Sequence, residues 1–360
     1  MGEEAIDTVE TMNKDPKRSK IAKGVWVVSS ILSFLFCLVW AMSFTWYKDY
    51  QAAIPGPLVG NKVSSTGALK EHGFPFSFIV IGDPHSRPEG FLLMKKAING
   101  GPSSFMVILG DLVRYPYVQR HRYFISALMK QVRPLFPVFV VTGNHDVNYN
   151  NEKRGMTPEQ YDSLYGSRNF DFVYNDCLFI LCGLDARDHT GYLRFLKDTL
   201  SHKAKGRKHI FIFMHWPPST PGIPAVHGLP GGKEFYRLLG HYRVTICFFG
   251  DYHGYWRGLR EGTSLIVSGG GGGDPSNEET EWGKFHHLLR ITVNENGFTE
   301  EMMISADTRD DIRERLKKRM FISLFPIIEG RGWILYFLFM CFLAWGISSV
   351  IIFFRLLKKR

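Results

Sequence analysis

The chain of 360 residues lacks several features that would assign it to a common class of protein. It contains no Asn-x-Ser/Thr glycosylation sequence, no internal repeat and no Gly-x-x-x-x-Gly-Lys-Ser/Thr phosphate loop. It has only five cysteines, two of which, Cys177 and Cys182, share one strand-like run. Their separation of roughly 16 Å along an extended strand is too large for a disulfide. Cys247 could pair with either of them across neighbouring strands, but buried free thiols are the favoured interpretation, and no disulfide framework is visible.

Excess charge is missing from the middle of the chain. The net charge is +10, but residues 1–23 are balanced, with five basic and five acidic groups. Residues 309–360 hold eleven basic and four acidic groups, so most of the excess lies in this tail. A basic tail is typical of a solvated helix flank or of contact with anionic lipid headgroups. We therefore expect no nucleic-acid partner.

Two long runs contain no charged residue at all, over residues 24–47 and 332–354. Each has about 23 residues, which is enough for a helix to cross a hydrocarbon core of ~30 Å. A cleavable signal peptide is the alternative for the first run, but its apolar stretch is too long and no small-x-small site follows closely. The sequence thus predicts two transmembrane helices and a lipid bilayer as a partner.

The basic residues around these runs predict the orientation of the chain. Five basic residues precede the first run, and four follow the second: Lys14, Lys17, Arg18, Lys20 and Lys23, then Arg355, Lys358, Lys359 and Arg360. The positive-inside rule places both termini in the cytoplasm and the domain between them on the periplasmic or lumenal side. The seven Lys and Arg residues of 309–331 argue against this topology.

Residues 308–325 offer an explanation for those bases. Apolar residues recur every fourth position from Ile312 to Leu324 between many basic ones, and Thr308 and Asp311 form a capping pattern. Such an amphipathic helix either lies on the membrane surface or packs on the central domain. The predicted organisation is a cytoplasmic tail (1–23), a transmembrane helix (24–47), a linker (48–75), a central domain (76–307), an amphipathic helix and linker (308–331), a transmembrane helix (332–354) and a basic cytoplasmic tail (355–360).

Within the central domain, five short apolar runs each end in a residue type that binds metals. Helical patterns over 88–99, 117–132, 191–203 and 233–239 separate such runs, which predicts an α/β domain with largely parallel strands. Residues 286–293 and 298–304 read as a hairpin turned at Asn296-Gly297. Ligands gather beyond the carboxyl ends of parallel strands, where these residues fall: Asp83, His85, Asp111, Asn144, His215, Asp251 and His253.

Taken together, these motifs resemble the calcineurin-like metallophosphoesterase family. The resemblance covers about residues 76–304 and is carried by Asp83-x-His85, Gly110-Asp111, Gly143-Asn144-His145-Asp146, His215 and Gly250-x-x-His253. It implies a four-layer αββα sandwich, a site for two divalent metal ions and hydrolysis of phosphoesters.

The resemblance also implies roles for single residues. Asp83, His85 and His253 would hold one metal, Asn144 and His215 the other, and Asp111 would bridge them. Two metals clamp a phosphoryl group and activate the attacking water. His145 would protonate the leaving-group oxygen, and Asp146 would orient His145 and raise its pKa.

One position departs from the family pattern. The last motif of the family reads Gly-His-x-His, whereas this chain has Gly250-Asp251-Tyr252-His253. A carboxylate at Asp251 favours Mn²⁺, with Fe²⁺ or Zn²⁺ as alternatives. It either retunes the second metal site or weakens it enough to impair catalysis.

The substrate is less well defined. Arg87 and Arg114 follow two ligand motifs and are candidate phosphate contacts, although solvated surface arginines are an equal alternative. The glycines at 269–273 could bring N–H groups to a phosphate or form a flexible connection. The membrane segments favour a phosphorylated lipid or headgroup, as a mono- or diester. The alternatives are a non-catalytic sensor or scaffold with a weakened second metal site, and a tethered nucleotide phosphodiesterase.

Overall fold

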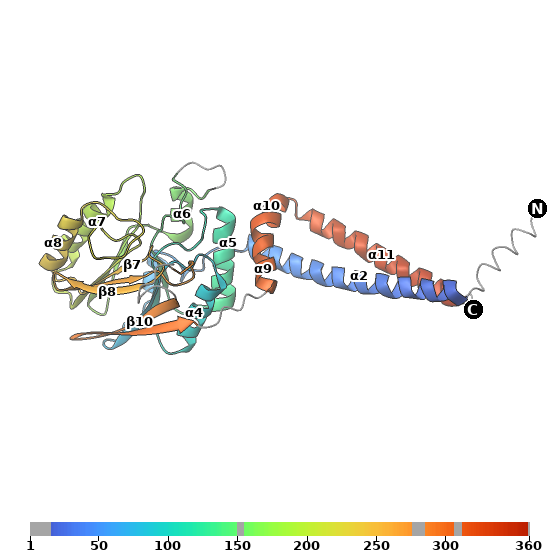
Figure 1. Cartoon of the computed structure of the whole chain (residues 1–360), viewed down its shortest axis with the longest axis horizontal. Coiled ribbons are helices and arrows are strands. Elements are labelled where there is room, and N and C mark those ends of the chain that lie inside the picture. The colour runs from blue at the N-terminus through green and yellow to red at the C-terminus, as the bar shows by residue number, and fades with distance from the viewer. Residues whose placement is uncertain (1–15, 150–154, 276–284, 306–311, 359–360) are drawn as a thin grey trace, which may run out of the picture. The chain divides into compact units, whose positions relative to one another are not determined.

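The structure is a computed structural model that describes residues 16–149, 155–275, 285–305 and 312–358 (Figure 1). The chain divides into two compact units. One comprises Ala52–Lys318, and the other comprises Met1–Gln51 with Arg319–Arg360. The capping pattern at Thr308 and Asp311 lies outside the described residues, as do residues 1–15 of the predicted tail.

The smaller unit is built on two long helices, α2 (Pro16–Gln51) and α11 (Trp333–Lys358). They pair antiparallel, since Trp40 Nε1 donates to the Leu335 carbonyl over 2.6 Å and Trp26 Nε1 donates to that of Ser349 over 3.2 Å. Trp26–Gln51 and Trp333–Ile351 are long and apolar enough to cross a membrane. Both helices run past the predicted segments, 24–47 and 332–354. Their apolar side chains are mostly exposed, unlike those of core helices in soluble proteins.

The larger unit contains two β-sheets. The first sheet has the order β11 (Gly297–Ser305), β10 (His286–Asn294), β1 (Phe76–Ile81), β2 (Phe105–Ile108), β3 (Val138–Val140), and the second sheet has the order β4 (Phe170–Tyr174), β5 (Cys177–Cys182), β6 (His209–Met214), β7 (Ile246–Phe249), β9 (Thr263–Ser268), β8 (Tyr255–Arg260). In the first sheet, β1 lies parallel to β2 and β2 to β3, whereas β10 and β11 are antiparallel to their neighbours. In the second sheet, β5, β6, β7 and β9 are parallel, and β4 and β8 are antiparallel edge strands.

The two sheets pack face to face through a phenylalanine-rich core. Alternate residues of one strand serve two layers: Phe211 and Phe213 of β6 fill the space between the sheets, while Ile212 faces the helices on the outer side. This double burial explains why the strands read as unbroken apolar runs. Helices α7 (Gly191–Lys203) and α8 (Gly232–Tyr242) cover the second sheet, and α4 (Pro88–Asn99) and α5 (Val118–Ala127) lie beside the first (Figure 1). The predicted four-layer αββα sandwich is confirmed.

Most elements lie where their patterns predict. The helices over 88–99 and 191–203 match the expected bounds, and the predicted hairpin forms with its turn one residue earlier, at Glu295-Asn296. The pattern over 117–132 forms α5 followed by a π-helical segment, η1 (Leu128–Val132). The described cysteines are all free thiols. The elements without a prediction are α3 (Val63–Gly67), α6 (Pro158–Tyr165), β4 and β8. Of these, α6 carries a capping box from Thr157 and Gln160 that identifies its start.

The predicted amphipathic helix contacts the central domain through its polar side. It begins as α9 (Ile312–Arg319) and continues through η2 (Met320–Leu324) and α10 (Phe325–Ile328). Lys318 Nζ donates to the Ser86 carbonyl over 2.6 Å, and Glu314 accepts from Gln131 over 2.7 Å. Packing on the domain, one of the two interpretations left open, therefore applies to residues 312–318.

Candidate metal centre

The ligand-type residues meet where the carboxyl ends of both sheets converge. Asp83 and His85 follow β1, Asp111 follows β2, and the loop 143–146 follows β3. From the second sheet, His215 follows β6, and Asp251 and His253 follow β7. Backbone bonds hold neighbouring loops together, since His85 N donates to the Asp111 carbonyl over 2.9 Å. The strand order thus brings seven residues, spread over 171 positions of sequence, to one edge.

The first group of ligand atoms belongs to Asp83, His85 and His253, whose ligand atoms lie within 4.8 Å of one another. The His253 Nδ1 lies 2.7 Å from the Asp274 carbonyl. A carbonyl can only accept, so Nδ1 carries the proton and leaves the Nε2 lone pair for a metal. That Nε2 lies 3.7 Å from Asp83 Oδ1.

The second group is centred on His215 and Asp111. His215 Nδ1 lies 2.7 Å from the Leu109 carbonyl, which again leaves Nε2 as the free lone pair. This Nε2 lies 3.3 Å from Asp111 Oδ1 and 3.0 Å from Asn144 Oδ1. The other Asp111 oxygen, Oδ2, lies 3.3 Å from His85 Nε2. Asp111 therefore faces both groups, as a bridging ligand must.

Several of these residues adopt a left-handed backbone that side chains other than glycine rarely take. Their φ angles are +53° at Asp83, +49° at His85, +50° at Asp111 and +67° at Asp251. Such strain costs on the order of 1–3 kcal/mol for each residue and is typical of functional sites. Four occurrences at one sheet edge show that side-chain placement here outweighs local stability.

The charges of the site fit bound cations. Asp83 is fully buried, and its Oδ1 has no hydrogen-bond partner among the described residues. Burial, together with the carboxylates of Asp111 and Asp251, raises the pKa of Asp83 well above its ordinary value. Burial would also raise the pKa of Asp111, but the charges of His215, His85 and His145 hold it below its usual range. Buried carboxylates beside imidazoles form a donor set that suits divalent metals.

His145 lies next to this centre with its side chain 40% exposed. Its Nε2 is 3.8 Å from Asp111 Oδ2. Burial lowers the pKa of His145, and the Asp111 charge opposes that shift. The imidazole borders a cavity of about 630 Å³ that also reaches Asp111, Asn144 and residues 223–227. A substrate in this cavity would contact His145.

Asp146 does not play the predicted part. Its fully buried carboxylate accepts hydrogen bonds from Gly143 N at 2.9 Å and Val113 N at 3.4 Å. Within the described chain it makes no hydrogen bond to His145, and the pKa of His145 is lowered, not raised. Adjacent residues in this tight turn point apart, so Asp146 fixes the two ligand loops instead of orienting His145.

Asp251 is engaged by a loop that the sequence left unexplained. Its Oδ2 accepts from Val226 N over 3.0 Å and His227 N over 2.7 Å. Its Oδ1 lies 2.8 Å from His227 Nδ1 and 4.0 Å from His215 Nε2. The His227 ring stacks on Trp216 at 4.6 Å, and Trp216 Nε1 donates to Asn144 Oδ1 over 3.0 Å. His227 and Trp216 are thus parts of the site to which the sequence assigned no role, although Trp216 stands beside His215.

Arg87 and Arg114 both reach the edge of the centre, where they flank Asp274. Arg87 lies 2.6 Å from one Asp274 oxygen and Arg114 lies 3.7 Å from the other. Two of the preceding glycines use their N–H groups within the fold, since Gly271 N and Gly273 N donate to the carbonyls of Gly82 and Asp83 over 2.8 Å. A Cβ on Gly273 would overlap the His253 ring. The glycine loop therefore braces the metal ligands closely.

Two solved structures are similar to this chain. A purple acid phosphatase, PPD1, from yellow lupin (Lupinus luteus) seeds has a TM-score of 0.50 at 17% identity, covering 68% of this chain and 55% of the lupin chain. GAP50, the anchor in the inner membrane complex of Plasmodium, has a TM-score of 0.48 at 15% identity, covering 65% and 86%. No curated protein sequence matches the chain. A family model for calcineurin-like phosphoesterase matches residues 76–255. The chain therefore belongs to the calcineurin-like phosphoesterase family.

Proposed function

We propose that the protein is a membrane-anchored, two-metal phosphohydrolase that cleaves a phosphoester of a lipid-linked or headgroup substrate on the extracytoplasmic face. The observation that carries the proposal is the position of Asp111, whose two oxygens face His215 and His85 at 3.3 Å each. One carboxylate between two ligand groups is what a dinuclear phosphoesterase site needs.

Separate residues of this site would hold the two metals and donate the proton. Asp83, His85 and His253 would hold one metal, Asn144 and His215 would hold the other, with Asp111 shared. When bound, the metals neutralise phosphoryl charge and lower the pKa of the attacking water. His145 borders the open cavity and would give a proton to the leaving-group oxygen. Oxygen ligands from Asp83, Asp111 and Asn144 support Mn²⁺ over softer metals.

The membrane part of the proposal rests on α2 and α11. Both are long enough to span a bilayer, and the central unit continues directly from α2 at Ala52. An enzyme tethered through both ends of its domain meets membrane-linked substrates at high local concentration. The excess of basic residues before the first run supports the extracytoplasmic orientation. Protease protection of the domain in sealed vesicles tests this orientation.

The mechanism is tested with a generic aryl phosphate. Asp111→Ala and Asn144→Ala should each abolish Mn²⁺-dependent hydrolysis, while Arg237→Gln on exposed α8 should leave it unchanged. Hydrolysis retained by either site variant would contradict the two-metal mechanism. A screen of lipid phosphates and nucleotides in detergent, with Mn²⁺, Fe²⁺ and Zn²⁺ in turn, then identifies the substrate class.

The use of Asp251 by the 226–227 loop favours a second candidate, a non-catalytic sensor or scaffold. In that case the Asp251 carboxylate only accepts hydrogen bonds from the loop, and the protein does not bind a second metal ion. One bound metal ion per chain with no turnover in Mn²⁺ supports this candidate, and two ions with turnover exclude it.

A further inference from the structure

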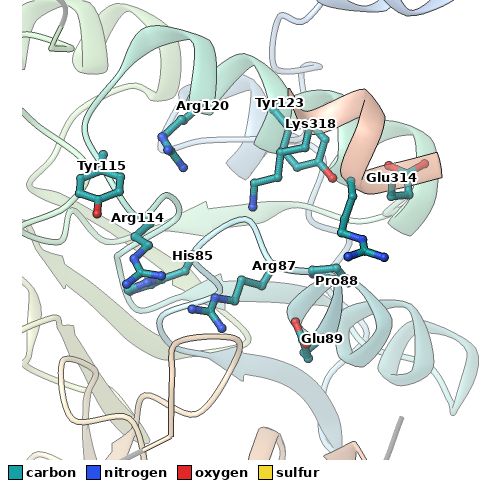
Figure 2. Close-up of a pocket in the computed structure, with 11 residues that line it drawn as sticks. His85, Arg87, Pro88, Glu89, Arg114, Tyr115, Arg120, Tyr123, Glu314 and Lys318 are labelled. Atoms are coloured by element: carbon teal, nitrogen blue, oxygen red, sulfur yellow. The ribbon is translucent and has the colours of Figure 1, made fainter. Parts of the chain in front are cut away.

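A second cavity, of about 640 Å³, begins at His85 and extends away from the ligand atoms. Figure 2 shows its lining side chains, which come from the loop after β1, the start of α4, the loop after β2, α5 and α9. Among the described residues that line it, two are acidic, Glu89 and Glu314, and five are basic: Arg87, Arg114, Arg120, Arg315 and Lys318. The cavity is therefore electropositive and continuous with the metal centre at His85.

Arg120 of α5 brings to the cavity a hydrogen-bond donor that has no acceptor among the described residues. Its guanidinium lies 4.8 Å above the Tyr115 ring, and its Nε is buried without a hydrogen-bond partner among the described residues. Across the described ranges, Arg120 has no carboxylate within 4.0 Å. A partly buried guanidinium with unmatched donors is unfavourable until an anion accepts from it.

The near end of the cavity already binds a carboxylate. The Asp274 side chain lies between Arg87 and Arg114, at 2.6 Å and 3.7 Å. Asp274 is 65% exposed, so water screens both ion pairs. A phosphate group, with more charge and three oxygens, matches two arginines better than a carboxylate does.

The far wall is formed by α9, which is fixed on the domain. Lys318 Nζ contacts the Ser86 carbonyl at 2.6 Å and lies 5.5 Å from the Tyr123 ring centre. Glu314, one of the two acids, is occupied by Gln131 at 2.7 Å. Figure 2 shows Arg120 of α5 and Lys318 of α9 both extending toward the loop of His85 and Arg87.

We propose that this cavity is a second anion site, which takes an additional phosphate group of a substrate whose scissile phosphoester lies at the metal centre. The inference rests on the proposed function and adds the substrate class, a phosphoester that bears a further phosphate. Either a phosphorylated lipid headgroup or a soluble bisphosphate provides this chemistry.

The test uses matched inhibitors of Mn²⁺-supported aryl phosphate hydrolysis, the mono- and bisphosphates of alkanediols with three to six carbons. In the wild type, the best bisphosphate should inhibit at least about tenfold better than its monophosphate. Arg120→Gln should remove that advantage without changing inhibition by the monophosphate. Asp274→Asn should strengthen inhibition by the bisphosphate severalfold, since it frees Arg87 and Arg114.

Arg237→Gln, an exposed arginine outside the cavity, serves as the control and should keep the wild-type ratio. The same ratio in Arg120→Gln as in the wild type, or no preference for any bisphosphate, overturns the inference. Aryl phosphate hydrolysis itself would then still stand, so the two proposals fail separately. Calorimetric binding of the same ligands gives the comparison without turnover.

A lipid arm identifies the source of the second phosphate. Dioctanoyl phosphatidylinositol and its 4-phosphate replace the soluble pair in the same assay. A larger advantage for the lipid 4-phosphate, lost in Arg120→Gln, assigns the site to headgroups. An advantage confined to the soluble bisphosphate, and also lost in Arg120→Gln, assigns it to soluble substrates.

Discussion

Asp251 Oδ1 lies 2.8 Å from His227 Nδ1, and this contact joins a predicted metal ligand to a loop of the cavity wall. His227 is held on its other side by stacking on Trp216. A partner that fixes a ligating carboxylate typically contributes 10–100-fold to metal affinity. The imidazole thus orients the carboxylate that replaces the histidine of the family motif.

We predict that His227→Ala weakens binding of the second metal by about tenfold or more, because Asp251 loses the side-chain partner of its Oδ1. The first metal, bound by residues that do not contact His227, should be held as in the wild type. A competition titration with a metal indicator measures both affinities. His202→Ala, at an exposed site on α7, is the control. Two unchanged affinities in His227→Ala would show that Asp251 does not ligate.

The sequence could predict which residues gather because each follows an apolar run, and parallel strands end at one edge. Side-chain partners were harder to predict. Asp146 stands beside His145 in sequence but bonds to Gly143 and Val113. Neighbouring positions in the sequence do not show where two side chains point in a tight turn, so the predicted contact between Asp146 and His145 was wrong.

The contacts between Asp251 and its loop could not be predicted from the sequence, for a different reason. Residues 223–227 have no periodic pattern, and their contacts depend on tertiary packing. The same holds for Lys318 of α9, which lies more than 200 positions from its acceptor at Ser86. Its pattern of apolar and basic residues is compatible with a membrane surface or a protein surface, and only folding distinguishes the two.

Asp83→Asn should stabilise the metal-free protein and abolish its stabilisation by Mn²⁺. Asp83 is buried near two other carboxylates, so its charge is unfavourable without a cation. Because its folded pKa is raised, the metal-free wild type loses stability as pH rises through that pKa, and the variant does not. The stability advantage of Asp83→Asn should therefore grow as pH rises above about 4, the ordinary range of an aspartate.

Thermal melts in EDTA and in Mn²⁺ measure this difference. Asp185→Asn provides the contrast, because Arg168 and Arg187 lie 3.0 Å and 3.1 Å from that carboxylate. Asp185→Asn should not raise the melting temperature in EDTA, and Mn²⁺ should still raise it as in the wild type. A metal-free Asp83→Asn that melts below the wild type at pH 8 would count against a cation site at Asp83.

Acid should destabilise the domain through two buried histidines. Burial lowers the pKa of His121 and of His287 to about 4. Both are neutral in the folded protein, so the stability that depends on them is complete above pH 6.5 and is lost as pH falls toward 4. Each contributes a slope of about 1.4 kcal/mol per pH unit in that window.

His287→Asn should reduce the slope by one histidine's share, because Asn does not titrate. Denaturant unfolding in detergent at several pH values between 4 and 7 measures the slope. His202→Asn, whose side chain is 71% exposed, should leave it unchanged. Equal slopes in the wild type and His287→Asn would mean that His287 takes up no extra proton on unfolding.

The variant Asp146→Ala tests whether Asp146 stabilises the two ligand loops or orients His145. The change leaves Gly143 N and Val113 N without their acceptor, at a cost of about 1–3 kcal/mol for each buried donor. Asp146→Asn keeps one acceptor oxygen and should lose about half as much stability. Because neither change touches His145, the pH dependence of kcat should keep its shape in the Asn variant at temperatures where it is folded. A displaced acidic or basic limb in Asp146→Asn, at full stability, would restore the direct link to His145.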